Sequence, residues 1–260
     1  MAHVLNQEQL DYLHRHFRVT TQLSCHRAQS ISAIQLLHPI ICDNYLNKVG
    51  IMLESPSKQV SASQFSKRYA FLIVVPALYT MSVYNKGLNV SLENSHIDSM
   101  HHDQHWMPTI RLESLEVTDP APGRRHVWRD QVLQTIFAHN LAKVWQALAK
   151  TANISKNILW ENTAIYVYWL YETRMEQETN KEIKGRISED FNYLVNEAPP
   201  YLFGESENPL KKYYHRPTTY NDEKQPVRIR KTCCLYDQLP SSAQDYCQTC
   251  PKKYRNCARG

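Results

Sequence analysis

The stretch RHVWRDQVLQTIFAHNLAKVWQALAK, residues 125–150, sets the architecture of this chain. Its apolar side chains recur every three or four residues, which places them along one face of a helix. The members of this stripe are Val132, Leu133, Ile136, Phe137, Leu141, Val144 and Leu148. The stretch therefore predicts a long amphipathic helix that packs against a hydrophobic core.

Two further helices are predicted after it. Ser155 is suited to cap a helix that runs to about residue 178, and this segment is apolar on most sides, so we expect a central core helix. Residues 182–196 carry apolar side chains on one face, and Pro199-Pro200 ends that helix. Because a Pro- and Gly-containing break lies at residues 119–123, we expect a helical subdomain to begin there.

The front half has a mixed pattern. Residues 7–17 predict a helix, and Pro39 is expected to kink or end a second helix that starts near residue 31. Residues 68–75, 80–85 and 88–93 are short β-branched or alternating runs, and Lys86-Gly87 separates the last two as in a hairpin. We therefore expect a small antiparallel sheet between about residues 50 and 118.

Together these patterns predict a mainly helical α+β protein, with a small antiparallel sheet in the N-terminal half and a C-terminal cysteine tail. A chain of 260 residues, of which 42% are hydrophobic and 21% charged, is long enough to bury a sizeable core. The expected division is a mixed α/β subdomain at residues 1–120, a helical subdomain at 121–232 and a cysteine tail at 233–260.

Composition and missing motifs narrow the functional classes. The N-terminus lacks the features of a signal peptide, and no apolar run approaches the roughly 20 residues of a spanning helix, so we expect a soluble, cytoplasmic protein with no membrane span. The chain has only 6 glycines and no Gly-x-Gly-x-x-Gly motif, which argues against a nicotinamide or flavin site. Hydrolase and P-loop motifs are also absent from the sequence.

Cysteines are concentrated at the C-terminal end. The tail contains Cys233-Cys234, twelve intervening residues, and then Cys247-Gln-Thr-Cys250-Pro251. Reduced, clustered thiols predict metal ligands rather than disulfides, and such sulfur donors suit zinc or an iron–sulfur cluster. Adjacent cysteines are rare in structural zinc sites, and a proline follows the last cysteine of ferredoxin-type ligand runs, so both details favour the cluster. Spacing alone leaves zinc, a redox dithiol and unligated thiols open.

The remaining cysteines receive simpler interpretations. Cys257 is predicted to be a free surface thiol, with a spare metal ligand as the alternative. Cys25 and Cys42 lie in apolar helical contexts and are expected to be buried as small hydrophobic residues.

The chain resembles the FhuF-like ferric-siderophore reductases. The resemblance is carried by Arg230-x-Thr-Cys-Cys and Cys-x-x-Cys-Pro in the tail, by Ile158-Leu-Trp-Glu-Asn162, which is similar to the family's Leu-Trp-Gly-Asn, and by the apolar run 69–78. Matched residue by residue, it implies that a 2Fe–2S cluster is bound by Cys233, Cys234, Cys247 and Cys250.

The chain departs from the family pattern in three ways. The gap between cysteine pairs is twelve residues rather than about ten, which enlarges a loop between the ligand pairs. Glu161 stands where glycine is usual, which puts in doubt any role that needs close backbone approach at that helix. Cys257 is additional.

The resemblance implies a cytoplasmic ferric-siderophore reductase. One electron would pass from the cluster to Fe(III) held by an oxygen-ligand chelator, and Fe(II) would be released. Hydroxamate, citrate and catecholate oxygens hold Fe(III) far better than Fe(II), so the added electron weakens the complex. Because the sequence has no nicotinamide or flavin motif, the electron must come from another protein, such as a ferredoxin, a flavodoxin or a flavin reductase.

Basic residues crowd the tail of this chain, whose net charge is +5, and such a surface attracts anionic ferric chelates. Arg228, Arg230 and Lys231 are closest to the first cysteine pair, and we predict that they contact the substrate together with Trp160. The competing interpretation is that the same residues dock an acidic electron donor.

Other features leave alternatives. His96, His101, His102 and His105 form a dense group that we expect in a solvated loop, with a contact to the chelate or a separate metal site as alternatives. A basic tail with tyrosines also fits a zinc-binding nucleic-acid or protein interaction module without redox activity. A third hypothesis is a scaffold related to siderophore synthetases, with cysteines that bind no metal. We predict the reductase, with no nucleic-acid partner.

Overall fold

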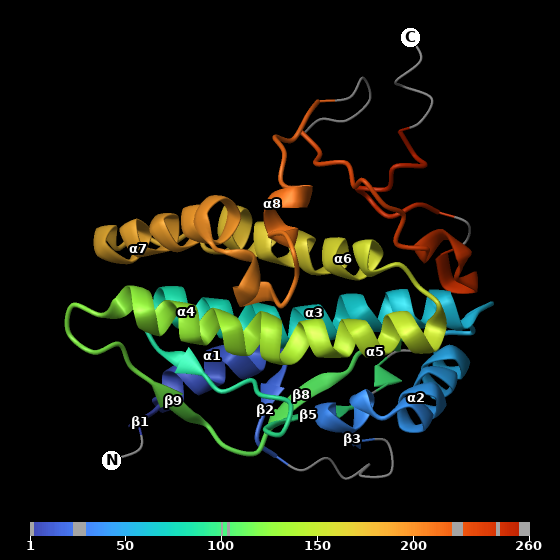
Figure 1. Cartoon of the computed structure of the whole chain (residues 1–260), viewed down its shortest axis with the longest axis horizontal. Helices are drawn as coiled ribbons and strands as arrows, with labels where there is room; N and C mark the ends of the chain where they lie inside the picture. The colour runs from blue at the N-terminus through green and yellow to red at the C-terminus, as the bar shows by residue number, and fades with distance from the viewer. Residues whose placement is uncertain are drawn as a thin grey trace.

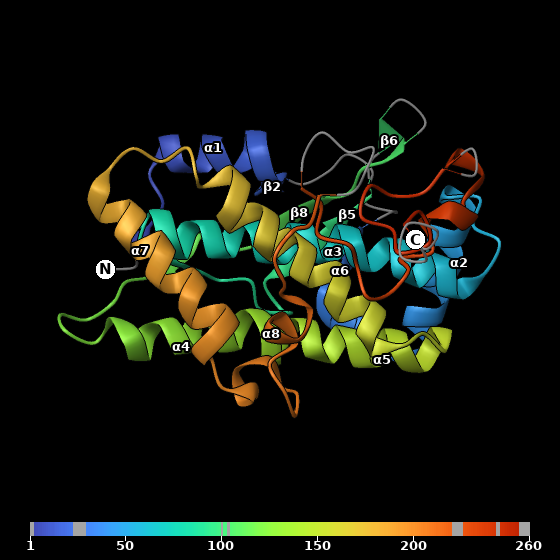
Figure 2. The same cartoon turned by 90° about the horizontal axis from the view of Figure 1, so that it is seen from above.

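Two layers of helices lie above a layer of small sheets in this computed structural model (Figure 1). It describes residues 3–22, 30–99, 101–102, 105–219, 226–242 and 245–254, with the backbone alone for 101, 102 and 105. Seen from above, α6 and α7 cross over α3 and α4 (Figure 2). These are α3 (Lys58–Val83), α4 (Arg125–Ile136), α6 (Lys156–Trp169) and α7 (Lys181–Asn192). The predicted fold class is confirmed: the protein is mainly helical, with its sheets in the N-terminal half.

The middle layer contains the helix predicted over residues 125–150. It is formed by α4 and α5 (Ala142–Ala152), joined by one π-helical turn at Phe137–Leu141. Asn140 in this turn is fully buried, accepts a hydrogen bond from the Tyr69 hydroxyl at 2.6 Å and donates to the Val90 carbonyl at 2.6 Å. A π turn contains one residue more than an α-helical turn. In this turn the Asn140 side chain contacts both Tyr69 of α3 and the backbone at Val90.

The upper layer confirms the two other predicted helices. Ser155 caps α6 by accepting a hydrogen bond from the Asn157 N–H, and α6 continues through a π-helical turn at Leu170–Arg174. The third predicted helix is α7, which continues through a π-helical turn at Tyr193–Glu197 before Pro199-Pro200. The short helix α8 (Pro209–Tyr213) follows and packs beside α6.

The lower layer contains α1 (Gln7–Phe17), which has the bounds predicted for it, and α2 (Pro39–Met52). The expected role of Pro39 was wrong, because this proline is the first residue of α2 rather than its end. A proline is tolerated there since the first helical N–H has no acceptor within the helix. The residues before it form strand β3 (Ser30–Ser32) and a 3₁₀ turn at Ala33–Leu37.

The sheets are small and mostly antiparallel. The larger has the order β2-β8-β5-β3, in which Ile97 of β5 pairs with Ile110 of β8 and Ile31 of β3, whereas β2 runs parallel to β8. A second has the order β1-β9-β4, and β6 pairs with β7 as a hairpin. Their bounds are β1 (His3–Val4), β2 (Val19–Thr20), β4 (Gly87–Leu88), β5 (Ser95–Asp98), β6 (His101–His102), β7 (His105–Trp106), β8 (Thr109–Leu112) and β9 (Glu116–Thr118).

The central helix α3 corrects the strand predictions. Residues 68–75 and most of 80–85 belong to this 26-residue helix, and Pro76 lies inside it. Most residues of α3 are buried, including the polar side chains of Ser63, Gln64 and Ser66. A helix that is enclosed on all sides lacks the apolar periodicity that distinguishes a helix from a strand in the sequence. The β-branched residues of such a segment then do not show which of the two it forms.

Buried apolar residues from Leu5 to Tyr213 form one contiguous core cluster around α3. Side chains from the predicted subdomains at residues 1–120 and 121–232 both belong to this core. The boundaries at residues 120 and 232 stay a prediction. Within the described residues, no helix combines the length and the apolar character needed to cross a bilayer.

Candidate metal centre

Two cysteine-bearing segments meet beside the N-terminal half of α3. The Arg230 N–H donates to the Thr249 carbonyl at 2.9 Å, which joins the two segments by their backbones. The Cys250 N–H donates to the Cys247 carbonyl at 2.9 Å and closes the Cys-x-x-Cys turn. The sulfur atoms of Cys234 and Cys247 lie 3.5 Å apart. The fold thus brings together two cysteine pairs that are separated by twelve residues in the sequence.

The sulfur atoms are enclosed by backbone and by a carboxylate. Cys234 and Cys250 are each 1% exposed. The Leu235 N–H points at the Cys233 sulfur at 3.4 Å, and Leu235 adopts the left-handed conformation, with φ of 60°. The Cys233 thiol also donates to Asp237 at 3.4 Å. An N–H aimed at sulfur favours the thiolate, which is the form that binds metals.

The thiols differ in acidity. Burial raises the pKa of Cys233 to about 11. The hydrogen bond with Cys247 lowers the pKa of Cys234, and the positive charges of Lys67 and Arg230 lower it further. That same hydrogen bond raises the pKa of Cys247. In the metal-free protein, Cys234 is therefore the member of this pair that ionises first.

The helix α3 supplies three side chains to this site from one face. The Ser63 hydroxyl and the Gln64 amide both donate to the Cys234 carbonyl at 2.7 Å. One turn further along, the Lys67 ammonium lies 4.0 Å from the Cys234 sulfur and 5.5 Å from the centre of the Tyr236 ring. Sequence reasoning missed these residues, since nothing in the local pattern of α3 marks them.

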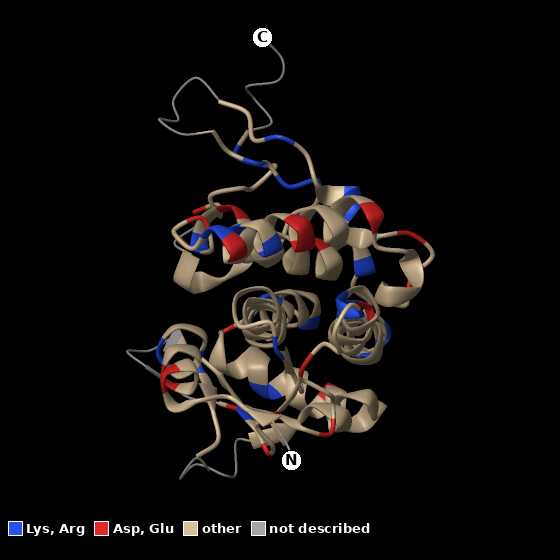
Figure 3. Ribbon diagram, turned by 90° about the vertical axis from the view of Figure 1, so that its left-hand side faces the viewer, with Lys and Arg blue, Asp and Glu red and all other residues tan. Residues whose placement is uncertain are grey.

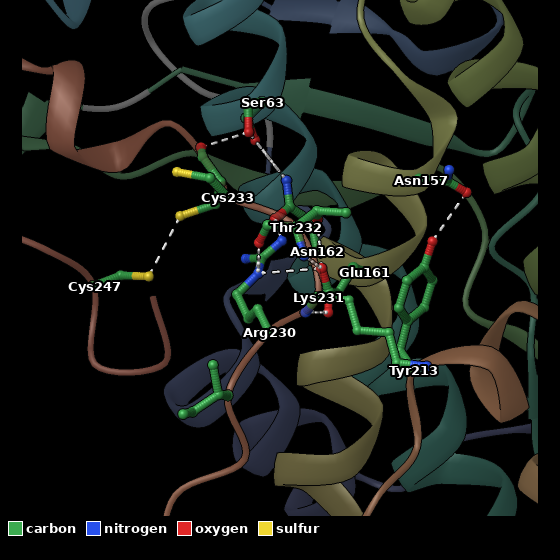
Figure 4. Close-up of polar contacts among 12 residues, drawn as sticks. Ser63, Asn157, Glu161, Asn162, Tyr213, Arg230, Lys231, Thr232, Cys233 and Cys247 are labelled. Atoms are coloured by element: carbon green, nitrogen blue, oxygen red, sulfur yellow. Dashed lines mark hydrogen bonds and ion pairs between the residues drawn. The ribbon is translucent and has the colours of Figure 1, made fainter. Parts of the chain in front are cut away.

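Glu161 of α6 holds the backbone that leads into the first cysteine pair (Figure 4). Its buried carboxylate accepts hydrogen bonds from the Lys231 N–H at 2.6 Å and the Thr232 N–H at 2.7 Å, and from the Thr232 hydroxyl. The Arg230 guanidinium lies 3.7 Å away. The residue that departs from the family pattern thus satisfies two backbone donors directly before Cys233.

Asn162 connects α3, α6 and the tail. Its carbonyl oxygen accepts from the Arg230 guanidinium at 2.6 Å, and its amide nitrogen donates to the Ser66 hydroxyl at 2.8 Å and the Ser63 carbonyl at 3.1 Å. Both Asn162 and Arg230 are almost completely buried. A buried polar network whose members are all paired fixes one arrangement of its segments, here the position of the cysteine tail on the helices.

Two of the predicted substrate residues, Arg228 and Trp160, bind carboxylates of the protein itself. The Arg228 guanidinium makes a two-pronged ion pair with Glu172 at 2.7 and 2.8 Å and lies over the ring of Tyr168. Trp160 is 4% exposed, and its indole N–H donates to Glu205 at 3.0 Å. Their contact with a substrate stays a prediction.

The other two predicted substrate residues, Arg230 and Lys231, lie shortly before the first cysteine pair. Arg230 is 4% exposed and bonded to Asn162, as described above. Lys231 is exposed, and its ammonium donates to the Lys212 carbonyl at 2.6 Å. Figure 3 shows basic residues along the C-terminal stretch above the helical layers. Of the four predicted contacts, Lys231 is the one whose side chain faces solvent.

The histidine group does not form a loop. His96 lies in β5 and pairs with Glu113 at 2.7 Å, and Asp98 is buried beside Arg111 at 3.3 Å. His101, His102 and His105 lie in the β6–β7 hairpin, and their side chains lie outside the described part of the structure. The expected solvated loop is replaced by short paired strands.

Cys42 is buried, as predicted, and burial raises the pKa of its thiol. The predictions for Cys25 and Cys257 fall outside the described residues.

The donor set fits an iron–sulfur cluster better than a harder ion. The Cys234 and Cys247 sulfurs lie 3.5 Å apart, with the Leu235 N–H at the Cys233 sulfur and a lysine near the Cys234 sulfur. Thiolate sulfur is a soft ligand that suits iron–sulfur clusters and zinc. Among the described residues, no three His, Cys, Asp or Glu side chains gather around a single point.

Comparison with known proteins gives two family matches. Residues 63–226 match the family described as "Ferric iron reductase FhuF-like transporter", and residues 230–252 match "FhuF 2Fe-2S C-terminal domain". No curated protein matches the chain. A solved structure of aerobactin synthetase IucC from a hypervirulent pathotype of Klebsiella pneumoniae is 12% identical, with a TM-score of 0.45, over 70% of this chain and 35% of that one.

The first match covers α3 to α8, and the second contains all four clustered cysteines that meet beside α3. This chain therefore belongs to the FhuF-like ferric iron reductase family and carries that family's C-terminal 2Fe-2S domain.

Proposed function

We propose that this protein is a ferric-siderophore reductase. In this proposal Cys233, Cys234, Cys247 and Cys250 hold a 2Fe–2S cluster, and one electron passes to Fe(III) in an oxygen-ligand chelate. The observation that carries it is the meeting of the two cysteine pairs, with 3.5 Å between the Cys234 and Cys247 sulfurs, inside the segment matched by the 2Fe-2S domain.

The protein's own residues have two tasks in this reaction. When bound, a 2Fe–2S cluster supplies one electron at a time. Ser63, Gln64 and Glu161 hold the backbone on either side of Cys233, so that the ligands keep their positions during electron transfer. Burial of Cys234 and Cys250 limits access of water to the sulfur atoms, which influences the reduction potential.

The iron complex is the substrate, and the protein needs no covalent bond to it. Oxygen donors such as hydroxamate, citrate and catecholate hold Fe(III) more strongly than Fe(II), so one added electron promotes release of Fe(II). We place the entry of anionic chelates at the exposed Lys231 beside the cysteines, with Arg228, Arg230 and Trp160 as the remaining proposed contacts. Positive charge at this surface raises the local concentration of anionic complexes.

The electron donor in this proposal is a separate protein of the ferredoxin, flavodoxin or flavin-reductase type, and the reaction takes place in the cytoplasm. The support for a separate donor is the lack of a recognisable nicotinamide or flavin motif in the sequence.

The test is reduction of defined ferric chelates by the protein itself. Protein purified without oxygen is reduced with dithionite, desalted and mixed with ferric citrate or a ferric hydroxamate, while Fe(II) is trapped with a coloured chelator. We expect Fe(II) to appear as the visible absorption of the cluster returns to its oxidised form. A cluster that stays reduced in the presence of each chelate would reject the function, and a colourless zinc protein would support an interaction module instead.

A further inference from the structure

The charged groups around the cysteines are unevenly compensated. Arg230 lies 3.7 Å from the Glu161 carboxylate, and Lys252 forms an ion pair with Asp237 at 2.6 Å. Lys67 differs, because no carboxylate of the described residues forms an ion pair with it. The groups near its ammonium are the Cys234 sulfur and the ring of Tyr236. Lys67 is therefore the cation next to the sulfurs whose charge is not balanced.

The sulfurs of Cys234 and Cys247 form one close pair. Two sulfurs bound to one tetrahedral metal at about 2.3 Å each lie about 3.8 Å apart. Cys234 and Cys247, at 3.5 Å, are close to this separation. Lys67 lies at this Cys234–Cys247 end of the site.

We propose that Lys67 sets the reduction potential of the cluster by stabilising the negative charge that reduction adds at the Cys234–Cys247 end. This inference rests on the proposed function, since it requires the four cysteines to hold the cluster. One electron enters from the external donor protein and leaves to the ferric chelate, and the step transfers the electron alone. Lys67 is a positioning residue for charge and takes no part in bonding.

The position of Lys67 on α3 puts its charge on the same helix face as the two residues that hold Cys234. Lys67 follows Ser63 and Gln64 by one turn, and these two residues fix the backbone carbonyl of the same cysteine whose sulfur Lys67 approaches. Residues three and four apart lie on one face of a helix. A rigid, buried helix therefore carries both the anchor of Cys234 and the charge beside it.

The Cys233 end of the site carries a carboxylate that is itself paired with a lysine. The Cys233 thiol contacts Asp237 at 3.4 Å, and a carboxylate beside a thiolate disfavours added negative charge. Lys252 offsets this carboxylate by binding its other oxygen. The charges beside Cys233 are thus balanced, whereas Lys67 favours added negative charge beside Cys234.

The test compares the midpoint potentials of full-length variants purified without oxygen. Lys67→Met removes the charge and keeps the length of the side chain, Lys67→Arg keeps the charge, and Lys58→Met removes a lysine from the first turn of the same helix. We expect Lys67→Met to lower the equilibrium constant for reduction about tenfold, a shift of about 60 mV to more negative potential for one electron. Lys67→Arg should recover most of the shift, and Lys58→Met should cause none.

The visible spectrum of each variant decides which idea fails. An intact cluster spectrum in Lys67→Met with an unchanged or more positive potential overturns the role of Lys67. If Lys67→Met does not retain the cluster, Lys67→Gln serves as the neutral variant, with the same expected direction. A shifted potential in Lys67→Met, together with wild-type protein that reduces no ferric chelate, instead rejects the proposed function and leaves the role of Lys67 standing.

Discussion

At the scale of single residues, Glu161 has the clearest local role. Its carboxylate accepts both backbone N–H groups that precede Cys233, and it lies beside Arg230 in a buried position. The sequence marked Glu161 only as an unusual replacement for glycine. The structure shows that the carboxylate of Glu161 joins α6 to the tail by accepting hydrogen bonds from two part-buried N–H groups.

Replacing Glu161 with glutamine should loosen the tail. The glutamine oxygen accepts one of the two N–H groups, but its NH₂ faces the other donor, and a buried unpaired donor costs about 1–3 kcal/mol. We expect faster loss of the visible absorption after a strong iron chelator is added. Glu207→Gln is the matched control, because Glu207 is exposed and pairs with Lys212. Equal bleaching rates for Glu161→Gln and wild type would contradict this role.

Serine at any of Cys233, Cys234, Cys247 or Cys250 should abolish both the colour and the ferric-chelate reductase activity. A hydroxyl is a poor ligand where a soft thiolate is required. The same change at Cys257 should leave both intact, as measured by the visible spectrum and by Fe(II) release. A bleached Cys257→Ser protein would show that the ligand assignment is wrong.

The sequence predicted the cysteines but not their partners, for a physical reason. Ligand spacing is local, because Cys247 and Cys250 lie in one turn. The groups that hold the ligands come from distant positions: Ser63 is 171 residues from Cys234, and Glu161 is 71 residues from Thr232. Only the packing of α3 and α6 brings these side chains to the tail.

At the scale of elements, the helices with a polar face were predictable and the central one was not. The bounds of α1 and the cap of α6 at Ser155 follow from local patterns, since apolar periodicity and capping act within one element. The helix α3 is buried on nearly every side, so its residues 68–75 were predicted as a strand. Pro39 shows the same ambiguity, because proline both begins and ends helices.

One buried carboxylate connects α3, α4 and α7 at the end remote from the cysteines. Asp190 is fully buried and accepts from Arg125 at 2.7 Å, Arg129 at 3.1 Å and the Ser82 hydroxyl at 2.8 Å. Both guanidinium groups depend on it for charge compensation inside the fold, together with Glu189 near Arg129. This network is structural and takes no part in the proposed reaction.

Asp190→Asn should therefore lower the free energy of unfolding by about 3 kcal/mol, since removing one partner of a buried ion pair leaves a buried charge uncompensated. Denaturant unfolding monitored by circular dichroism measures this change. Glu182→Gln, an exposed member of a pair with Arg186 on the same helix, should change the stability by less than about 0.5 kcal/mol. A similar small change for Asp190→Asn would refute the role of this network.

At the scale of the whole molecule, the arrangement separates the catalytic end from the structural end. The cysteine tail lies at the end of α3 that includes Ser63 and Lys67, whereas Asp190 and its arginines gather near Ser82 at the other end (Figure 1). One core connects both ends. The net charge of +5 was visible in the sequence, but which basic residues face solvent beside the cysteines depends on the fold.

Reduction of anionic chelates should depend on the charge of this exposed surface. Lys211 is an exposed residue of α8, next to Lys212, whose carbonyl the Lys231 ammonium contacts. Replacing Lys211 and Lys231 by glutamine should raise the KM for ferric citrate about two- to fivefold at low salt, and the difference should vanish near 0.5 M salt, because ions screen exposed charges. Initial rates at several salt concentrations measure this. Lys181→Gln with Lys184→Gln removes the same charge from α7, and an equal effect there would show that only net charge matters.

The proposed binding of a 2Fe–2S cluster by four thiolates of the tail can be checked on the purified protein. Protein purified without oxygen is analysed for iron, sulfide and zinc, and its visible and electron paramagnetic resonance spectra are recorded before and after reduction by one electron. We expect two irons and two sulfides per chain, visible absorption when oxidised, and a paramagnetic signal only when reduced. Zinc in place of iron, or no metal at these cysteines, would contradict it.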